Sequence, residues 1–301
     1  MKIRSLSLLA LTVAVSAWGA QAPRQLKVGE QPESVCRGFD GKLYVTIIGG
    51  NVPGDGAIHV VDGDRVSVFA KGLNAPKGIA FVGGFLVTAD ETDVCKIDAK
   101  GQVTRLAGAK DFPQPVEFLN DVAASLDGRA VYVTDMSLPG PMLDPSKERT
   151  LWALDSPQAR ALPAKGCVYR VGLDGKVSLV VPPGDARLRF PNGVTVTGTK
   201  AQETLVLGDF FTGNIVSWRN GTLEVLTTGL RGADAVEVDG DVIYVSSWTL
   251  GKVWAHDRTT GRTRVLLEGL TTAADFFHDR EHRQLIIPDM IAGTLTFLPL
   301  E

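Results

Sequence analysis

Short apolar runs alternate along the chain with clusters of Gly, Asp and Asn. Examples are KLYVTII, AIHVVDG, RVSVFA, GFLVTAD, AVYVTDM, TLVLGDF, VIYVSSW and QLIIPDM. Their enrichment in Val, Ile and Tyr between turn-forming residues is typical of β-strands. Stretches with a helical period are absent, and even the charged stretch DPSKERTLWALDSPQARALP is interrupted by prolines. The pattern therefore predicts an all-β protein.

Six segments of the chain follow one plan, in which a small or proline residue, a polar residue and a short strand precede a Gly/Asp turn and a second strand. They open near residues 32, 76, 119, 191, 233 and 274 with PESV, PKGI, LNDV, PNGV, ADAV and ADFF. Their polar second positions are separated by 44, 43, 72, 42 and 41 residues. A four-stranded propeller blade takes about 40–45 residues. The spacing therefore predicts a six-bladed β-propeller with an insertion at 137–166 in blade 3.

The last repeat stops near Thr296, before its outermost strand. The segment QLKVGE at residues 25–30 precedes the first repeat and can supply that strand. This arrangement closes the ring and leaves no free sheet edge. We therefore expect one domain, residues 23–301, closed by an N-terminal strand.

Residues 1–22 have the order of a secretory signal peptide. Lys2 and Arg4 precede an apolar run from Leu6 to Val15, and small residues follow it. The run is shorter than the roughly 20 residues of a membrane span. We expect a secreted or periplasmic protein that is not held in a membrane after signal cleavage. With 31 basic and 34 acidic residues, the chain also has no basic field for nucleic acid.

The cysteines Cys36, Cys95 and Cys167 are too widely spaced for a metal knuckle or a CxxC redox motif. An oxidising compartment permits one disulfide among them and leaves one thiol. The alternative is that they are small buried side chains. The sequence leaves their pairing open.

The innermost strands of a propeller line its central channel, so the six polar second positions should converge there. These residues are Glu33, Lys77, Asn120, Asn192, Asp234 and Asp275. Such groups are costly to bury unless they bind something, although a solvated channel lining is the alternative. Carboxylate and amide oxygens suit Ca²⁺ best, with Mg²⁺, Mn²⁺ or Zn²⁺ as further candidates, and the lack of His and Cys argues against a closed structural zinc site.

Over the whole mature chain, these motifs resemble the SMP-30/gluconolactonase/luciferin-regenerating-enzyme family, which is related to diisopropyl-fluorophosphatases and paraoxonases. PESV looks like the family's first-blade Glu motif, LNDV like its Asn-Asp motif and PNGV like its Asn-Gly motif. ADAV is similar to the Asp-Gly motif except that Ala235 replaces Gly. The resemblance implies a calcium-dependent propeller lactonase whose metal ligands are Glu33, Asn120, Asn192 and Asp234.

Lys77 departs from the family pattern, and the role of Asp275 is not determined by the sequence. Lys77 lies in PKGI, where paraoxonase-like members resemble PHGI with a histidine that acts in proton transfer. Lys77 is therefore either a base with a lowered pKa or a countercharge for Asp275 and Glu33. Asp275 is a base, a further ligand or the partner of Lys77. In such a site a carboxylate near the metal activates water. The catalytic candidates are Asp275, Lys77 and Asp234.

The insertion 137–166 follows a second strand, so it should overhang the channel mouth as a lid or specificity wall; a solubilising surface loop is the alternative. We expect Trp152, Phe210, Phe211 and Trp248 to line a substrate pocket there, unless these side chains pack between blades.

The resulting prediction is an exported divalent-metal-dependent hydrolase of a lactone or related ester, with a small-molecule substrate. The alternatives are a non-catalytic propeller that binds a ligand or protein partner, and an enzyme resembling strictosidine synthases. The sequence does not determine the oligomeric state.

Overall fold

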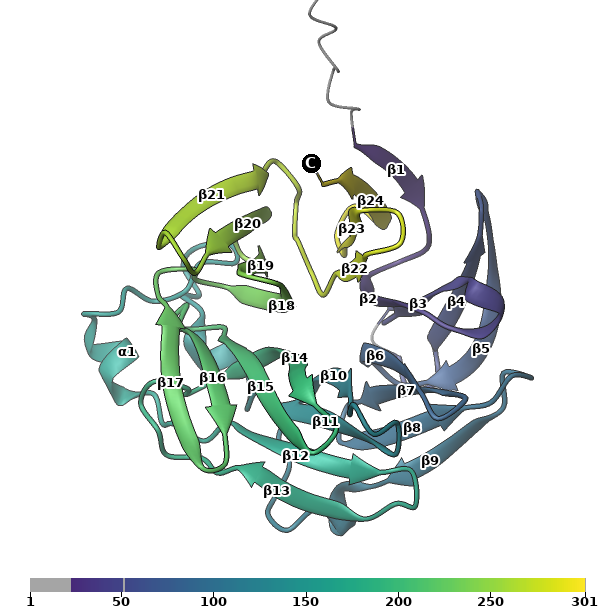
Figure 1. Cartoon of the computed structure of the whole chain (residues 1–301), viewed down its shortest axis with the longest axis horizontal. Coiled ribbons are helices and arrows are strands. Elements are labelled where there is room, and N and C mark those ends of the chain that lie inside the picture. The colour runs from purple at the N-terminus through teal and green to yellow at the C-terminus, as the bar shows by residue number, and fades with distance from the viewer. Residues whose placement is uncertain (1–22, 51, 301) are drawn as a thin grey trace, which may run out of the picture.

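Six four-stranded antiparallel sheets are arranged around a central axis in the computed structural model (Figure 1). The structure describes residues 23–50 and 52–300, so the expected signal peptide at 1–22 lies outside the described residues. The prediction of a six-bladed β-propeller is confirmed.

Each of the first five blades is a continuous run of chain in which the first strand is innermost. Blade 1 consists of β2 (Pro32–Arg37), β3 (Leu43–Ile47), β4 (Gly56–Asp62) and β5 (Arg65–Leu73), and blade 2 of β6 (Pro76–Val82), β7 (Phe85–Asp90), β8 (Asp93–Ile97) and β9 (Val103–Ala107). Blade 3 consists of β10 (Leu119–Ala124), β11 (Ala130–Asp135), β12 (Cys167–Gly172) and β13 (Val177–Val181). Blade 4 consists of β14 (Pro191–Thr199), β15 (Gln202–Asp209), β16 (Ile215–Arg219) and β17 (Thr222–Thr227), and blade 5 of β18 (Ala233–Asp239), β19 (Val242–Ser247), β20 (Lys252–Asp257) and β21 (Arg262–Leu267).

Both ends of the chain contribute to the sixth blade. It contains β22 (Phe277–Asp279), β23 (Gln284–Asp289) and β24 (Thr294–Pro299), and β1 (Arg24–Lys27) is its outermost strand. The antiparallel register pairs Arg24 with Phe297 and Lys27 with Thr294. Ring closure by an N-terminal strand is therefore confirmed.

Apolar side chains from neighbouring blades pack against each other and form the core. Val87 of blade 2, for example, lies in one buried cluster with Val133 and Tyr169 of blade 3. Alternate side chains of a strand point to opposite faces of its sheet, so each blade can contact both of its neighbours. The apolar face-to-face packing leaves the first residues of the innermost strands at the axis.

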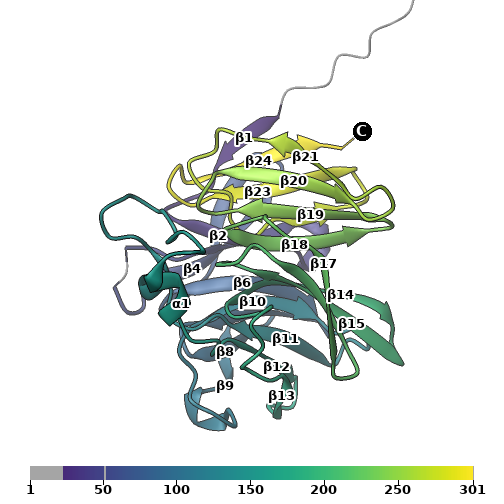
Figure 2. The same cartoon turned by 90° about the vertical axis from the view of Figure 1, so that its left-hand side faces the viewer.

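The insertion 137–166 projects from one face of the ring (Figure 2) and contains the 3₁₀ turn η3 (Gly140–Met142) and the short helix α1 (Pro157–Ala161). Two further 3₁₀ turns, η1 (Phe39–Gly41) and η2 (Ala109–Asp111), lie in other loops. Met142 and Leu151 of the insertion are buried in one apolar cluster with Phe190 and Phe211 of the propeller. The insertion is therefore packed onto the ring by a small core of its own.

Two arginines of the propeller also hold the insertion. Arg231 donates to the carbonyl oxygen of Trp152 at 2.7 Å, and Arg189 donates to the carbonyl oxygens of Ala159 and Leu162. These charged donors satisfy carbonyl groups that no strand would pair.

None of the helices formed by the described residues has the length and apolar character needed to span a bilayer.

Candidate functional site

Aspartates at the ends of second strands fix the starts of the inner strands. Asp90 accepts hydrogen bonds from the amides of Asn74 and Ala75, which directly precede β6. Asp135 and Asp209 make the same contacts before β10 and β14. The repeated anchor places equivalent side chains of these blades at the same height along the axis.

The inner strands of blades 1 to 5 are irregular at their first residues. In each of them the pairing register with the second strand shifts between the opening residue and the fourth residue, as between Leu119 and Val122. Such β-bulges turn side chains out of the regular alternation and occur next to functional sites. Here they lie at the polar second positions of the repeats.

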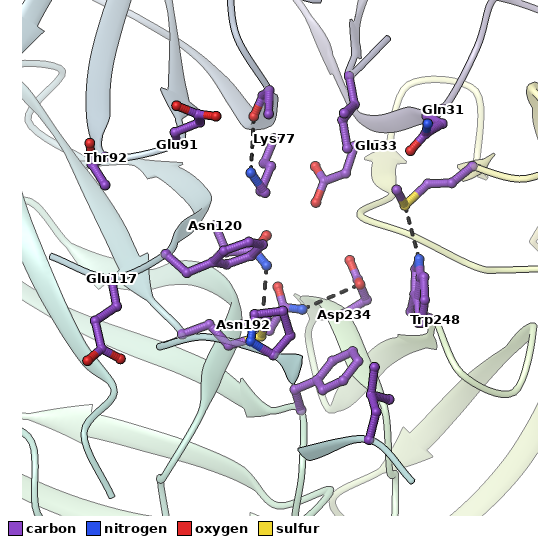
Figure 3. A pocket seen from close by; sticks show the side chains of 18 residues that line it. Gln31, Glu33, Lys77, Glu91, Thr92, Glu117, Asn120, Asn192, Asp234 and Trp248 are labelled. Carbon is purple, nitrogen blue, oxygen red and sulfur yellow. Dashed lines mark hydrogen bonds between the residues drawn. The ribbon is translucent and has the colours of Figure 1, made fainter. Parts of the chain in front are cut away.

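Four of the predicted ligands lie together at the floor of one cavity. Glu33, Asn120, Asn192 and Asp234 come from β2, β10, β14 and β18, and none is more than 5% exposed. Their side chains point into the same space (Figure 3), which belongs to a cavity of about 550 Å³. The structure thus brings together the residues that the repeat placed at the channel in these four blades.

Each of these four side chains has a buried oxygen without a hydrogen-bond donor. The atoms are Glu33 Oε2, Asn120 Oδ1, Asn192 Oδ1 and Asp234 Oδ1. The amide nitrogens are used elsewhere, since Asn192 Nδ2 donates to Asp234 Oδ2 at 3.4 Å and Asn120 Nδ2 to the sulfur of Met136 at 3.8 Å. Leaving a buried polar atom unpaired is costly. Four such acceptors around one space fit a bound cation, and the all-oxygen set fits a hard ion such as Ca²⁺.

The two carboxylates at the floor are electrostatically unfavourable on their own. Burial raises the pKa of Glu33 well above its ordinary value, and repulsion from Asp234 raises it further. Burial likewise raises the pKa of Asp234, with repulsion from Asp121 as the next cause. A divalent cation between the oxygens would offset both effects.

Lys77 lines the same cavity but forms no ion pair within 4.0 Å among the described residues. Its Nζ donates to the carbonyl oxygen of Ala75 at 3.1 Å and lies 4.4 Å from the centre of the Phe118 ring. Burial lowers the pKa of Lys77, while Glu33 acts in the opposite direction. The direct countercharge contact with Glu33 or Asp275 is therefore absent, and Lys77 presents an ammonium group to the cavity.

Asp275 lies one residue out of the predicted register. Asp289 accepts from the amides of Thr271 and Thr272, so the sixth repeat opens at Ala273 instead of 274. The hydroxyl of Ser246 donates to the carbonyl oxygen of Ala274, as that of Thr134 does to Asn192. Ala274 therefore occupies the channel position. A shift of one residue changes which side a residue faces. The prediction that the Asp275 side chain lies in one ring with that of Glu33 was therefore wrong, although the Asp275 amide donates to the carbonyl oxygen of Glu33 at 3.0 Å.

A second layer of polar groups lies below the first. Asp275 accepts a hydrogen bond from the Ser34 hydroxyl, and Asp121 accepts from the amides of Val122 and Val194 at 2.6 Å each. Both aspartates line a separate cavity of about 480 Å³, which we call the lower cavity. The cavity of about 550 Å³ that holds the four predicted ligands is the upper cavity. Burial raises the pKa of Asp121 to about 6, although its two amide donors oppose that shift. These groups connect neighbouring inner strands and do not line the upper cavity.

The predicted pocket residues divide into two pairs. Phe210 and Trp248 line the upper cavity. Phe211 is fully buried in the apolar cluster under the insertion, and Trp152 packs against that cluster, so neither lines the cavity. The insertion contributes Pro139 and Leu143 to the wall instead.

Phe210 and Trp248 share their position in the repeat with other wall residues, which were not predicted. The residue directly after the second strand of every blade lines the cavity, and this ring consists of Ile48, Glu91, Met136, Phe210, Trp248 and Met290. We call these six residues the upper ring. The signal was available in the sequence, because strand-end motifs such as TDM, GDF and PDM place an apolar residue after the aspartate.

Two other groups of residues do not form a site. Asp279, Glu281 and His282 place ligand atoms within 4.8 Å of one another, but Asp279 already accepts hydrogen bonds from Arg37 and Gln284. The cysteines Cys36, Cys95 and Cys167 are buried free thiols.

A scan against protein-family models finds no match to this chain, and a search of curated proteins finds none either. The function is therefore inferred from the residues of the site.

Proposed function

We propose that this protein is an exported, divalent-metal-dependent hydrolase of a lactone or related ester. Ca²⁺ is the expected ion, held by Glu33, Asn120, Asn192 and Asp234. The observation that carries the proposal is the set of four unpartnered, buried oxygens at the cavity floor, one from each of these side chains. The motif resemblance to calcium-dependent propeller lactonases supports the same assignment.

The donor set agrees with a catalytic ion better than with a structural one. Two carboxylates balance the charge of one divalent cation. Ca²⁺ takes six to eight oxygen ligands, so four side chains leave room for water and substrate. When bound, the ion would supply Lewis-acid polarisation of a substrate carbonyl oxygen.

Asp234 is the general base in this proposal. Its Oδ2 accepts from the side-chain amide of Asn192, which orients the carboxylate. Its Oδ1 is the oxygen assigned to the cation, so Oδ2 is the oxygen that takes the proton. A carboxylate fixed in this way can take a proton from an attacking water molecule. Asp275 is not assigned this role, because it lines the other cavity.

Lys77 is assigned to the leaving group. One of its three N–H donors is used by the carbonyl oxygen of Ala75. The ammonium group faces the cavity and can donate a proton to the alkoxide that leaves when the ester bond breaks. Its positive charge also reduces the repulsion among the carboxylates of the floor.

Metal analysis of the purified protein, combined with a lactone and ester panel assayed before and after chelation, tests the proposal. We expect one calcium ion per chain and turnover that chelation abolishes and added Ca²⁺ restores. The Asp234→Ala variant should remain folded but lose both the metal and turnover. Bound calcium without turnover of any ester would favour a non-catalytic binding propeller, and protein that binds no divalent ion would refute the proposal.

The export part of the proposal has its own test. We expect the mature protein outside the cytosol, with a new N-terminus close to residue 23. N-terminal sequencing of protein from the periplasm or the medium measures this. Full-length protein retained in the cytosol would contradict export and leave the hydrolase assignment intact.

A further inference from the structure

The walls of the upper cavity differ from its floor in chemistry. Five of the six upper-ring residues are apolar, and only Glu91 carries a charge. Phe118, which directly precedes β10, adds apolar surface, as do Pro139 and Leu143 of the insertion. The polar floor is therefore surrounded by a mainly hydrophobic wall.

Several of these apolar side chains are only partly covered by protein. Phe118, Pro139, Leu143, Trp248 and Met290 are half-buried, whereas Ile48, Met136 and Phe210 are buried behind them. When an apolar ligand covers apolar surface inside a concave site, the free energy of binding becomes more favourable. The largest gain would come from a substituent that contacts the Trp248 and Met290 side chains, which also contact each other at 3.0 Å between Nε1 and the sulfur.

Most polar groups around the wall are already engaged. Gln31 donates to the carbonyl oxygen of Gly49 at 2.8 Å. Glu117 accepts from Ser137 and forms an ion pair with Lys165 at 2.9 Å. Glu91 and Thr92 lie farther from the floor (Figure 3), and Glu91 is exposed. A ligand with many hydroxyl groups would lose its hydration there and regain few hydrogen bonds.

The charges of the cavity give anions no net attraction. Four carboxylates line it, from Glu33, Glu91, Glu117 and Asp234, and Lys77 is the one cation among the described lining residues. One divalent ion, together with Lys165, which pairs with Glu117 at 2.9 Å, brings the net charge to 0. A substrate with its own carboxylate or phosphate would therefore gain no net electrostatic attraction.

We infer that the substrate is a neutral lactone or ester carrying an alkyl or aryl substituent, and not a polyhydroxylated sugar lactone. This inference rests on the proposed hydrolase function and adds the substrate class. The carbonyl group lies at the floor, and the substituent lies along the upper ring against the side chains of Trp248 and Met290.

Three neutral six-membered lactones test the substrate class. δ-Valerolactone has no substituent, δ-decanolactone carries a pentyl chain, and glucono-δ-lactone carries hydroxyl groups. With calcium-loaded protein, and after correction for spontaneous hydrolysis, we expect kcat/KM for δ-decanolactone to exceed that for glucono-δ-lactone at least 100-fold. It should exceed that for δ-valerolactone at least tenfold, because each buried methylene contributes roughly fourfold. Equal or better hydrolysis of glucono-δ-lactone would overturn the inference.

A variant pair locates the substituent. Met290→Ser should lower the ratio of kcat/KM for δ-decanolactone over δ-valerolactone by at least fivefold. Leu250→Ser is the matched control, because Leu250 is 52% exposed and does not line the cavity. An unchanged ratio in Met290→Ser would show that the chain binds elsewhere and would refute the proposed position.

Binding separates this inference from the proposed function. Tryptophan fluorescence is titrated with δ-decanolactone and with glucono-δ-lactone, and Trp248→Phe supplies the background. Saturable quenching by δ-decanolactone alone, without turnover, would refute the hydrolase and retain the apolar selectivity. Equal affinity for both lactones would refute the selectivity whether or not either is hydrolysed.

Discussion

The Ser34 hydroxyl donates a hydrogen bond to the Asp275 carboxylate across the junction between the first and the last blade. The same hydroxyl oxygen accepts from the amide of Ile79 in blade 2 at 3.3 Å. One small side chain therefore connects β2, β6 and the segment that precedes β22. This contact lies directly below Glu33, so it also supports the floor of the candidate metal site.

Ser34→Ala should destabilise the metal-free protein. The change leaves the carboxylate of Asp275 and the amide of Ile79 without a partner, at a cost of about 1–3 kcal/mol in the free energy of unfolding. Urea denaturation measures the loss. Ser67→Ala, at an exposed position of β5, is the control and should change the unfolding free energy by less than about 0.5 kcal/mol. Equal midpoints for the two variants would contradict this role of Ser34.

The charge at the floor should affect the metal-free and the calcium-bound protein in opposite directions. Glu33→Gln removes a buried carboxylate beside Asp234, so we expect a higher melting temperature in EDTA and a smaller shift on adding Ca²⁺. Asn120→Asp adds a carboxylate and should do the reverse, lowering the melting temperature in EDTA and enlarging the calcium shift. Thermal unfolding with EDTA and with Ca²⁺ measures both. A calcium shift as large in Glu33→Gln as in the wild type would count against the ligand set.

Glu237 should make stability depend on pH. It lines the lower cavity, and burial raises its pKa to about 7. In the unfolded chain the pKa of Glu is about 4.3. Between these values the folded protein holds a proton that the unfolded chain has lost, so stability falls as pH rises from about 4.3 to 7 and levels off above that range.

Glu237→Gln should therefore reduce the difference in stability between pH 5 and pH 8. Denaturation midpoints at the two pH values measure this effect. Glu224→Gln, at an exposed site of β17, is the control and should leave the difference as it is in the wild type. If both variants keep the wild-type difference, Glu237 is not its source.

Arg231→Ala should loosen the insertion. The guanidinium group donates to the carbonyl oxygens of Trp152 and Phe211 at 2.7 and 3.0 Å, and both carbonyls lose this donor in the variant. We expect faster hydrogen–deuterium exchange in 137–166 and little change in strands β2 to β9. Arg160→Ala is the control, because the guanidinium group of Arg160 donates to the carbonyl oxygen of Asp155, which lies in the insertion as well. Unchanged exchange in the Arg231 variant would show that the apolar cluster alone holds the insertion.

The repeat in the sequence was sufficient to predict the architecture and four members of the site. Their equivalence was unambiguous, because each follows an opening residue and is followed by the short apolar run of its repeat. The four residues are Glu33, Asn120, Asn192 and Asp234. The six-bladed ring, its closing strand and the convergence of these residues are found in the structure.

The register of the sixth repeat could not be obtained in the same way. Ala273 and Ala274 are both small, and only the register that opens at 274 puts a polar residue, Asp275, at the second position, so the plan of the repeat favoured the wrong register. The register is decided by the contacts of Asp289 with Thr271 and Thr272, which depend on the folded backbone.

The wall of the cavity was also only partly predictable. Phe210 and Phe211 are neighbours in the sequence, but one lines the cavity and the other is buried under the insertion. The difference arises from how the insertion folds back onto blades 3 to 5, and this has no counterpart in the other repeats.

The pairing of β1 with β24 has a consequence for how the molecule is made. Arg24 and Phe297 pair across almost the whole chain, and contacts between such distant residues form slowly. On a ribosome the final blade cannot be completed until β24 has been synthesised. The five other blades can assemble earlier, so the open ring is the natural folding intermediate, and the seam between the chain ends is where we expect unfolding to begin.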